Sequence, residues 1–177
     1  GHVLTPGRYV GAEAAEDEAF LAHMDRVKRD LDEYMAGTGT WYRKSHGPSD
    51  RPLVAYFSME IAVEAQIPTY SGGLGILAGD ILRSAADLNL PMVGITLASR
   101  RGYFRQLLSP GGEQREEPDP WDPAAACQPL SAKVSVDIEG RQVWVRGWLH
   151  AIEGHQGDHL PVIFLDVDLP ENSPNDR

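Results

Sequence analysis

The sequence predicts an α/β fold, and three features of its middle part carry this prediction. Residues 53–57 form a short apolar segment rich in strand-forming residue types. A glycine-rich turn and an amphipathic helical pattern follow, and residues 91–97 then form a second apolar segment. This order of strand, long loop, glycine turn, helix and strand is typical of one βαβ unit.

Residues 11–36 predict a helix at the N-terminal end. Their apolar residues recur at three- and four-residue steps, which makes one stripe: Phe20, Met24, Val27, Leu31 and Tyr34. We expect this stripe to pack on its own domain and assign no chemistry to it. Residues 41–52 have the composition of a linker, in which His46 is expected to be solvated. Residues 1–50 are therefore expected to form a helix and a linker ahead of the main domain.

The glycine-rich turn at residues 71–75 is the first candidate site. Three of its five residues lack a β-carbon, so a ligand can approach the backbone. A helix follows, with one expected apolar stripe at Leu74, Leu77, Ile81, Ala85 and Leu88. Free N–H groups and the positive end of the helix dipole suit an anion such as phosphate. A purely structural turn and helix cap is the alternative, because the segment has neither a dinucleotide fingerprint nor a P-loop ending.

Three arginines within six residues form the second candidate, since Arg100, Arg101 and Arg105 together can cradle a phosphate or sugar hydroxyls. A turn at Gly102 with solvated arginines is the alternative, and the pattern alone favours it. Residues 112–123 are acidic and broken by prolines, which predicts a surface loop, and the adjacent carboxylates Glu116 and Glu117 are expected to be solvated there.

The residue pattern in the last third of the sequence predicts β-strands. Residues 132–138 alternate apolar and polar side chains, residues 139–140 form a turn and residues 142–149 return, which predicts an antiparallel β-hairpin. Residues 160–167 predict a third strand. Trp144 and Trp148 share one face and are expected in the core, with a sugar-stacking surface as the alternative. The possible metal ligands His155, Asp158 and His159 lie on a glycine-bearing turn without a fixed helical face, so no metal is expected.

Composition and net charge restrict the kinds of partner that the protein is expected to bind. The formal net charge is −10, so nucleic acid and anionic membranes are poor partners, because both bind a basic surface. No segment approaches the roughly 20 apolar residues of a membrane span. The single cysteine, Cys127, excludes an internal disulfide and favours a reducing, cytoplasmic setting. Nothing in the sequence marks Cys127 as a nucleophile.

Five motifs in order resemble the α-glucan (glycogen/maltodextrin) phosphorylases, with the prokaryotic branch nearest. They cover residues 54–61, the glycine segment 68–80, residues 84–91, residues 102–106 and residues 166–172. The match runs from about residue 51 to the end of the sequence. Ser71 suits the prokaryotic branch, whereas the animal enzymes carry Asn there.

This resemblance implies a fold and a reaction. The family has a glycosyltransferase-B-type architecture, in which two Rossmann-like domains face each other. We therefore expect residues 51–177 to be the N-terminal part of the first of these domains, incomplete by itself. The reaction is retaining phosphorolysis, in which orthophosphate cleaves the terminal α-1,4-glucosidic bond of a glucan and releases glucose 1-phosphate. The family uses pyridoxal phosphate, whose lysine lies in the second domain, so the chain alone is expected to be inactive. The missing C-terminal domain is the expected protein partner, and the resemblance leaves oligomerisation open.

The resemblance also assigns site residues. Gly72 and Gly73 would bring backbone N–H groups towards the substrate phosphate, Leu74 would contact the glucose unit, and Glu60 would line the pocket and order the loop that contains Ser71. No catalytic residue and no metal ligand is expected in this part of the enzyme.

Two other functions remain alternatives. Glycogen synthase-like transferases, which use nucleotide sugars, share a Gly-Gly-Leu-Gly turn. They usually carry a Lys shortly before it, where this chain has residues 68–71, Pro-Thr-Tyr-Ser. A glucan-binding module without catalytic activity is the second alternative.

Overall fold

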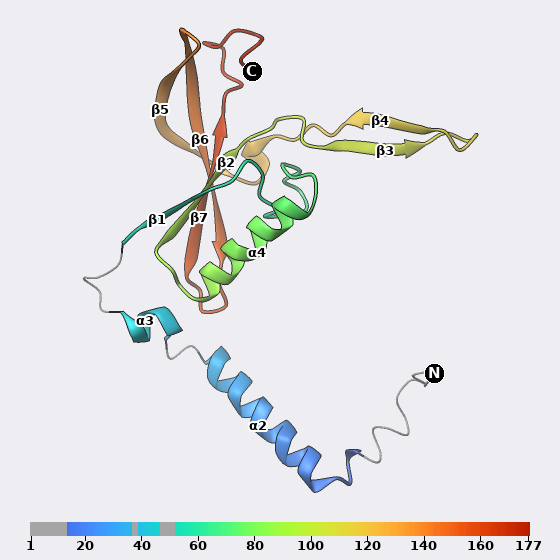
Figure 1. The fold of residues 1–177 in the computed structure, drawn as a ribbon, viewed down its shortest axis with the longest axis vertical. Helices are drawn as coiled ribbons and strands as arrows, with labels where there is room; N and C mark the ends of the chain where they lie inside the picture. Colours follow the sequence, from blue (N-terminus) through green and yellow to red (C-terminus); the bar gives the residue numbers. More distant parts are fainter. Residues whose placement is uncertain (1–13, 37–38, 47–51) are drawn as a thin grey trace. The chain divides into compact units, whose positions relative to one another are not determined.

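The computed structural model describes residues 14–36, 39–46 and 52–177, and the chain divides into two compact units, Gly1–Gly39 and Thr40–Arg177 (Figure 1). The described part of the first unit contains helix α2, Glu18–Met35. Asp17 caps this helix by accepting hydrogen bonds from the N–H groups of Ala19 and Phe20. The expected helix is therefore present from Glu18 onward, while residues 11–13 lie outside the described part. No residue of α2 is buried, so packing of its apolar stripe within its own domain is not observed.

The second unit is built on a five-stranded mixed sheet in the order β1-β2-β7-β6-β5. These strands are β1 Val54–Phe57, β2 Met92–Leu97, β7 His159–Asp166, β6 Arg141–Glu153 and β5 Gln128–Ile138. The first three are parallel, whereas β6 is antiparallel to both β7 and β5. The α/β class, the βαβ unit and the β5–β6 hairpin predicted from the sequence are therefore confirmed. The hairpin belongs to the same sheet as the parallel strands.

Helix α4, Gly73–Asp87, connects β1 to β2 and packs against β6 and β7 (Figure 1). The predicted core-facing stripe is wrong except at Ala85, because Leu74 and Leu77 are about 60% exposed and Ile81 and Leu88 nearly 40%. The buried face instead consists of small residues and one leucine: Gly75, Ala78, Gly79, Leu82, Ala85 and Ala86. Close approach explains this choice, since a β-carbon at Gly79 would lie 2.2 Å from the Ala62 carbonyl oxygen.

A short helix, α3 Trp41–Ser45, lies in the segment predicted as a linker. The Thr40 hydroxyl caps it by accepting from the Arg43 N–H at 3.3 Å, and Tyr42 is buried. The expectation that His46 is solvated is wrong, because its ring stacks on Tyr42 with centroids 4.3 Å apart and its Nδ1 is buried.

A second antiparallel hairpin, β3 Phe104–Leu108 with β4 Gln114–Pro118, projects from the sheet (Figure 1). Its strand β4 lies in the segment predicted as an acidic surface loop, so that prediction is wrong in conformation but right in exposure. The turn at residues 109–113 closes the hairpin, and Gly102, with φ +56°, marks the bend before it. A 3₁₀ turn, η1 Pro123–Ala125, leads back to β5.

The core lies between α4, the segment 61–67 and the central strands. Phe164 and Val162 of β7 and Leu82 of α4 are fully buried there. Trp148 is buried, which confirms its expected place in the core, and Trp144 on the same strand is half-buried. Within the described ranges, no helix is both long and apolar enough to cross a bilayer.

Candidate functional site

The carboxyl ends of the three parallel strands meet at one edge of the sheet, and polar segments follow each of them. Glu60 comes after β1, Ser99 to Arg101 come after β2, and Asp168 comes after β7. Because α4 runs opposite to the parallel strands it connects, its N-terminus lies at this same edge. Open α/β sheets bind ligands in this position.

Glu60 organises the turn before α4. One carboxylate oxygen, Oε2, accepts from the Ser71 N–H at 2.8 Å and from the Ser71 hydroxyl at 3.1 Å. The other, Oε1, accepts from the Gly75 N–H at 3.1 Å. Gly72, which caps the helix, has no side chain to accept a bond itself. Glu60 therefore acts as the cap, and its negative charge lies at the positive end of the helix.

Three backbone N–H groups of the turn stay available. Within the described part of the chain, the N–H groups of Gly72, Gly73 and Leu74 donate to no protein acceptor. A helix leaves its first N–H groups without intrahelical partners, and here Glu60 takes only that of Gly75. The structure thus leaves an anion three donors at a helix N-terminus.

The glycines of this segment differ in whether the surrounding atoms leave room for a side chain. A β-carbon at Gly72 or Gly73 would meet no atom within 4 Å, whereas one at Gly75 would lie 2.6 Å from the Tyr70 β-carbon. Gly72 is extended, with φ 160°, which any residue can adopt. Internal packing therefore demands glycine at Gly75 and Gly79, but at Gly72 and Gly73 it leaves open space.

A pocket of about 330 Å³ adjoins the turn, and Glu60 and Ser71 line it together with residues from the ends of β1 and β2. Tyr70 and Tyr103 give it aromatic walls, and Ser99 adds a hydroxyl. Of the five predicted site residues, the structure thus brings Glu60 and Ser71 to one pocket. Gly72, Gly73 and Leu74 follow directly in the chain but do not line it, and the Leu74 side chain is exposed.

The three predicted arginines do not converge. Arg105 lies on β3 opposite Glu117, and Arg101 is exposed. Arg100 turns towards the sheet, where its Nη2 lies 2.9 Å from the Asp166 carboxylate. The predicted shared cradle is therefore wrong. The alternative is right about the turn at Gly102, but Arg100 is ion-paired and half-buried rather than solvated.

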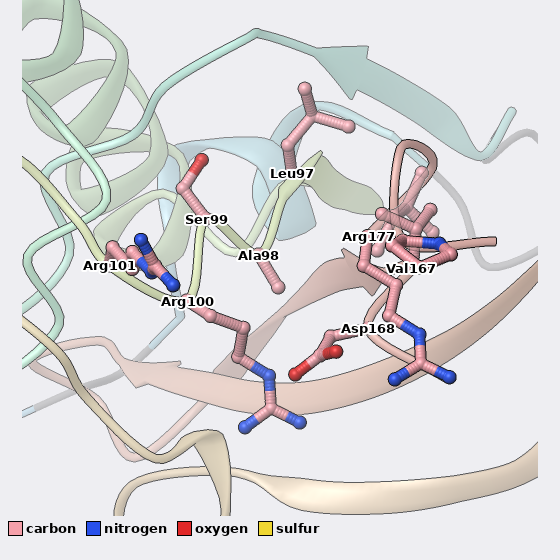
Figure 2. Close-up of a pocket in the computed structure, with 10 residues that line it drawn as sticks. Leu97, Ala98, Ser99, Arg100, Arg101, Val167, Asp168 and Arg177 are labelled. Atoms are coloured by element: carbon pink, nitrogen blue, oxygen red, sulfur yellow. The ribbon is translucent and has the colours of Figure 1, made fainter. Parts of the chain in front are cut away.

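Figure 2 shows a second pocket at the same edge, of about 730 Å³, where β2 and β7 end. Arg100, Arg101 and Arg177 line it, and the side chain of Asp168 lies in its wall. Leu97 and Ser99 belong to both pockets, so the two hollows adjoin. The described edge is consequently one polar surface that combines carboxylates, guanidinium groups and free amides.

Asp166 at the end of β7 is a residue that sequence reasoning missed. Its side chain is fully buried and accepts from the Trp148 indole N–H at 2.8 Å, the Arg100 guanidinium and the Asp168 N–H. Burial acts to raise the pKa of Asp166, but these hydrogen bonds prevail and hold the pKa below its usual value. The charged carboxylate therefore fixes Arg100, and with it the segment after β2.

Two further features of the sequence are the single thiol, Cys127, and the turn that carries His155, Asp158 and His159. Burial raises the pKa of the Cys127 thiol to about 11, which leaves little thiolate at neutral pH. Asp158 pairs with Arg43, and the His155 N–H donates to Asp87. Among the described residues, no cluster of three or more His, Cys, Asp or Glu side chains could hold a metal ion.

The sequence of this chain is similar to one family model and to several known proteins. A family model described as a protein of unknown function, DUF3417, matches residues 8–67. The chain is 38% identical over 172 residues to glycogen phosphorylase of Mycobacterium tuberculosis, which covers 90% of this chain and 19% of that protein. It is 34% identical over 172 residues to maltodextrin phosphorylase of Thermococcus litoralis, covering 93% of this chain and 20% of that protein.

Glycogen phosphorylase of Aquifex aeolicus is 28% identical over 169 residues, covering 92% of this chain and 23% of that protein. The chain thus spans about one fifth of the length of the curated relatives it matches.

Proposed function

We propose, from the confirmed similarity of this chain to the N-terminal part of glycogen and maltodextrin phosphorylases, that it forms one wall of the phosphate and glucan site of such an enzyme. The complete protein would cleave terminal α-1,4-glucosidic bonds with orthophosphate and release glucose 1-phosphate with retention. The chain's contribution is to bind and orient phosphate and the sugar next to it.

The single structural observation that supports this proposal is that Glu60 accepts hydrogen bonds from some of the backbone N–H groups at the α4 N-terminus and not from others. Glu60 accepts hydrogen bonds from Ser71 and Gly75, whereas the N–H groups of Gly72, Gly73 and Leu74 have no acceptor among the residues that the structure describes. Open space at Gly72 and Gly73 lets a phosphate oxygen approach these amides closely. Such preorganised donors stabilise charge on a phosphate without rearranging as the bond breaks. The Leu74 side chain, which is exposed, would contact the sugar in this proposal.

Charge explains why this chain alone would bind phosphate weakly. The Glu60 carboxylate lies beside the free amides and repels an anion. The half-buried arginine at the same edge, Arg100, already neutralises Asp166. We therefore assign the remaining positive charge of the phosphate site to the second domain of the full-length enzyme.

The residues of this chain do not fit the cofactor that the resemblance implies. Pyridoxal phosphate is held by a lysine, and the sequence has three, Lys28, Lys44 and Lys133. Lys28 pairs with Asp32, Lys133 pairs with Glu171, and none of the three lines either pocket at the carboxyl edge. We propose that the rest of the enzyme supplies the site for pyridoxal phosphate.

For the domain organisation, we propose that residues 51–177 are the N-terminal part of a Rossmann-like domain and that residues 1–50 precede it as a helix and linker. The βαβ unit with the candidate site at the carboxyl edge supports this proposal. A second Rossmann-like domain would then face this edge, in the glycosyltransferase-B arrangement. The proposed setting is the cytoplasm, where glucan and orthophosphate would be the small-molecule partners.

The direct test is release of glucose 1-phosphate from maltodextrin and orthophosphate, measured for residues 1–177 and for the full-length protein. We expect activity in the full-length protein alone. Phosphorolysis or stoichiometric pyridoxal phosphate in the 177-residue chain would refute the division of labour proposed here. A full-length protein that binds maltodextrin but releases no glucose 1-phosphate would favour a binding module.

A further inference from the structure

A third hollow lies at the base of the β3–β4 hairpin, which projects from the sheet in Figure 1. It has a volume of about 330–320 Å³ class, namely about 320 Å³, and is lined by residues 101–104 and 116–118; we call it the hairpin groove. Gly102 and Tyr103 line both this groove and the pocket that contains Glu60 and Ser71. The two hollows therefore adjoin.

Backbone contacts hold the base of the hairpin beside the glycine turn. The Tyr103 N–H donates to the Pro68 carbonyl at 3.1 Å, and the Asp119 N–H donates to the Arg101 carbonyl at 3.2 Å. Gly102 has φ +56°, and a β-carbon there would lie 2.4 Å from the Pro68 carbonyl oxygen. Because Pro68 belongs to the segment that leads into the glycine turn, the groove keeps a fixed position relative to the candidate site.

Two aromatic rings form part of the groove. Tyr103 is 47% exposed, and its ring lies against that of Phe104 with centroids 4.2 Å apart. Since side chains alternate along a strand, the register of the hairpin places Phe104, Pro118 and Glu116 on one face. An exposed aromatic ring next to polar groups suits a sugar, whose C–H groups pack on the negative face of the ring.

The polar side chains of the groove are available to a ligand. Within the described part of the chain, the side chains of Arg101 and Glu117 form no hydrogen bond and no ion pair. Glu116 accepts from the Gln114 amide through Oε1 at 2.9 Å, which leaves its Oε2 without a described partner. A guanidinium group only donates and a carboxylate only accepts, whereas a sugar hydroxyl does both. The groove therefore offers partners for both roles of a hydroxyl.

The charge of the groove favours a neutral ligand. Glu116 and Glu117 outweigh the single guanidinium group of Arg101, and the whole chain has a net charge of −10. Carboxylates in excess of cations repel phosphate, nucleotides and other anions. A chain of uncharged, hydroxyl-bearing rings meets no such repulsion and can use the aromatic, donor and acceptor groups together.

We propose that the hairpin groove binds glucose units of the glucan that lie beyond the terminal unit at the glycine turn. This inference rests on the proposed function, which brings that terminal unit to Leu74 and Glu60. Because Tyr103 lines both hollows, a glucan that starts at the turn continues into the groove along one surface. The groove would thus make long glucans better substrates than short ones.

Titration of the 177-residue chain with maltoheptaose tests the binding step. The NMR signals of the Gly102, Tyr103 and Glu116 amides should shift at about 10 mM sugar. Tyr103→Ala should raise the dissociation constant at least about threefold, whereas Tyr103→Phe keeps the aromatic face and should stay within about twofold of wild type. Unshifted amides, or equal dissociation constants for wild type and Tyr103→Ala, would overturn the proposal.

A matched pair of charge removals tests the groove in catalysis and does not depend on the folding of Tyr103→Ala. Glu116→Ala removes a carboxylate that lines the groove, and Glu113→Ala removes an exposed one from the hairpin turn. In the full-length protein, Glu116→Ala should lower the ratio of kcat/KM for maltoheptaose to that for maltotetraose at least about threefold, mainly through KM. Glu113→Ala should leave this ratio unchanged. Equal ratios in the two variants would contradict the proposal.

Loss of this proposal and loss of the proposed function are distinguishable. An active full-length phosphorylase whose chain-length ratio is unchanged by Glu116→Ala would reject the groove and retain the function. An inactive full-length protein, together with a 177-residue chain that binds maltoheptaose less tightly after Tyr103→Ala, would support the groove and reject the function.

Discussion

The carboxylate of Glu60 accepts two hydrogen bonds from Ser71, one from its backbone N–H at 2.8 Å and one from its hydroxyl at 3.1 Å. These residues lie eleven positions apart, at the two ends of the long loop between β1 and α4. Their contact fixes the start of α4 and decides which amides of the turn remain free for a ligand.

Replacing Glu60 tests this contact. Glu60→Gln removes the charge at the helix N-terminus and weakens the bonds to Ser71 and Gly75, so the free energy of unfolding of the 177-residue chain should fall by about 1 kcal/mol. Glu64→Gln is the control, since Glu64 only approaches Arg83 to 3.8 Å at the surface, and should cost less than about 0.5 kcal/mol. Urea unfolding measures both, and equal effects would show that Glu60 does not hold the turn.

Alanine substitutions distinguish a glycine that internal packing requires from a glycine that leaves space for a ligand. Gly79→Ala would press a β-carbon against the Ala62 carbonyl and should destabilise the chain by about 1–3 kcal/mol. Gly73→Ala meets open space at the first residue of α4, so stability should be unchanged or rise by up to about 1 kcal/mol. Thermal unfolding distinguishes the two variants, and a destabilised Gly73→Ala variant would mean that the open space is absent in solution.

The buried carboxylate of Asp166 should make the free energy of unfolding depend on pH. Its pKa is below the ordinary 3.8, because the Trp148, Arg100 and Asp168 hydrogen bonds outweigh the effect of burial. A carboxyl whose pKa is lower in the folded state adds stability above its unfolded pKa, and that stability is lost as the pH falls through the folded pKa. Asp166→Asn should therefore cost about 3 kcal/mol at pH 7 and flatten the loss of stability between about pH 5 and pH 2.

Asp122→Asn is the matched control for this pH series. Asp122 approaches the same guanidinium, that of Arg100, at 3.5 Å, but its carboxylate is exposed. Its substitution should change stability by less than about 0.5 kcal/mol and leave the acid dependence intact. A wild-type chain whose stability does not fall below pH 4 would contradict the role assigned to Asp166.

Cys127 should react slowly with thiol reagents. Its pKa of about 11 leaves roughly one thiol in a thousand ionised at pH 8, and the side chain is buried. A chromogenic disulfide reagent should label the folded chain at least about a hundredfold more slowly than the urea-unfolded chain. Similar rates in the two states would mean that the segment around Cys127 opens readily.

The sequence predicts the central βαβ unit well, because residues 53–57 and 91–97 are short apolar segments on either side of a helical pattern. It did not predict which face of α4 is buried. Apolar side chains lie on more than one side of that helix, and periodicity alone favours the larger ones. The choice depends on how closely the helix approaches the carbonyl oxygen of Ala62, which is a property of tertiary packing.

The β3–β4 hairpin lacks a sequence signal for a related reason. Its strands are largely exposed on both faces, so no apolar alternation marks them, and only the turn at residues 109–112 hints at a reversal. The link between Arg100 and Asp166 spans 66 residues, and no local pattern announces it. Glu60 could be predicted only through the family resemblance, although its contact with Ser71 now gives the assignment a physical basis.

The most direct test of the proposed phosphate site is kcat/KM for orthophosphate in the full-length protein carrying Gly73→Val. The β-branched valine side chain at this position would fill the space in which phosphate approaches the Gly73 amide, so kcat/KM should fall by at least about a hundredfold. Gly111→Val, in the turn of the β3–β4 hairpin, is the control substitution, because a β-carbon there would meet its nearest atom, the Ser109 hydroxyl oxygen, at an ordinary 3.7 Å; it should leave kcat/KM within about twofold of wild type. A Gly73→Val enzyme as active as the Gly111→Val enzyme would contradict phosphate binding at the glycine turn.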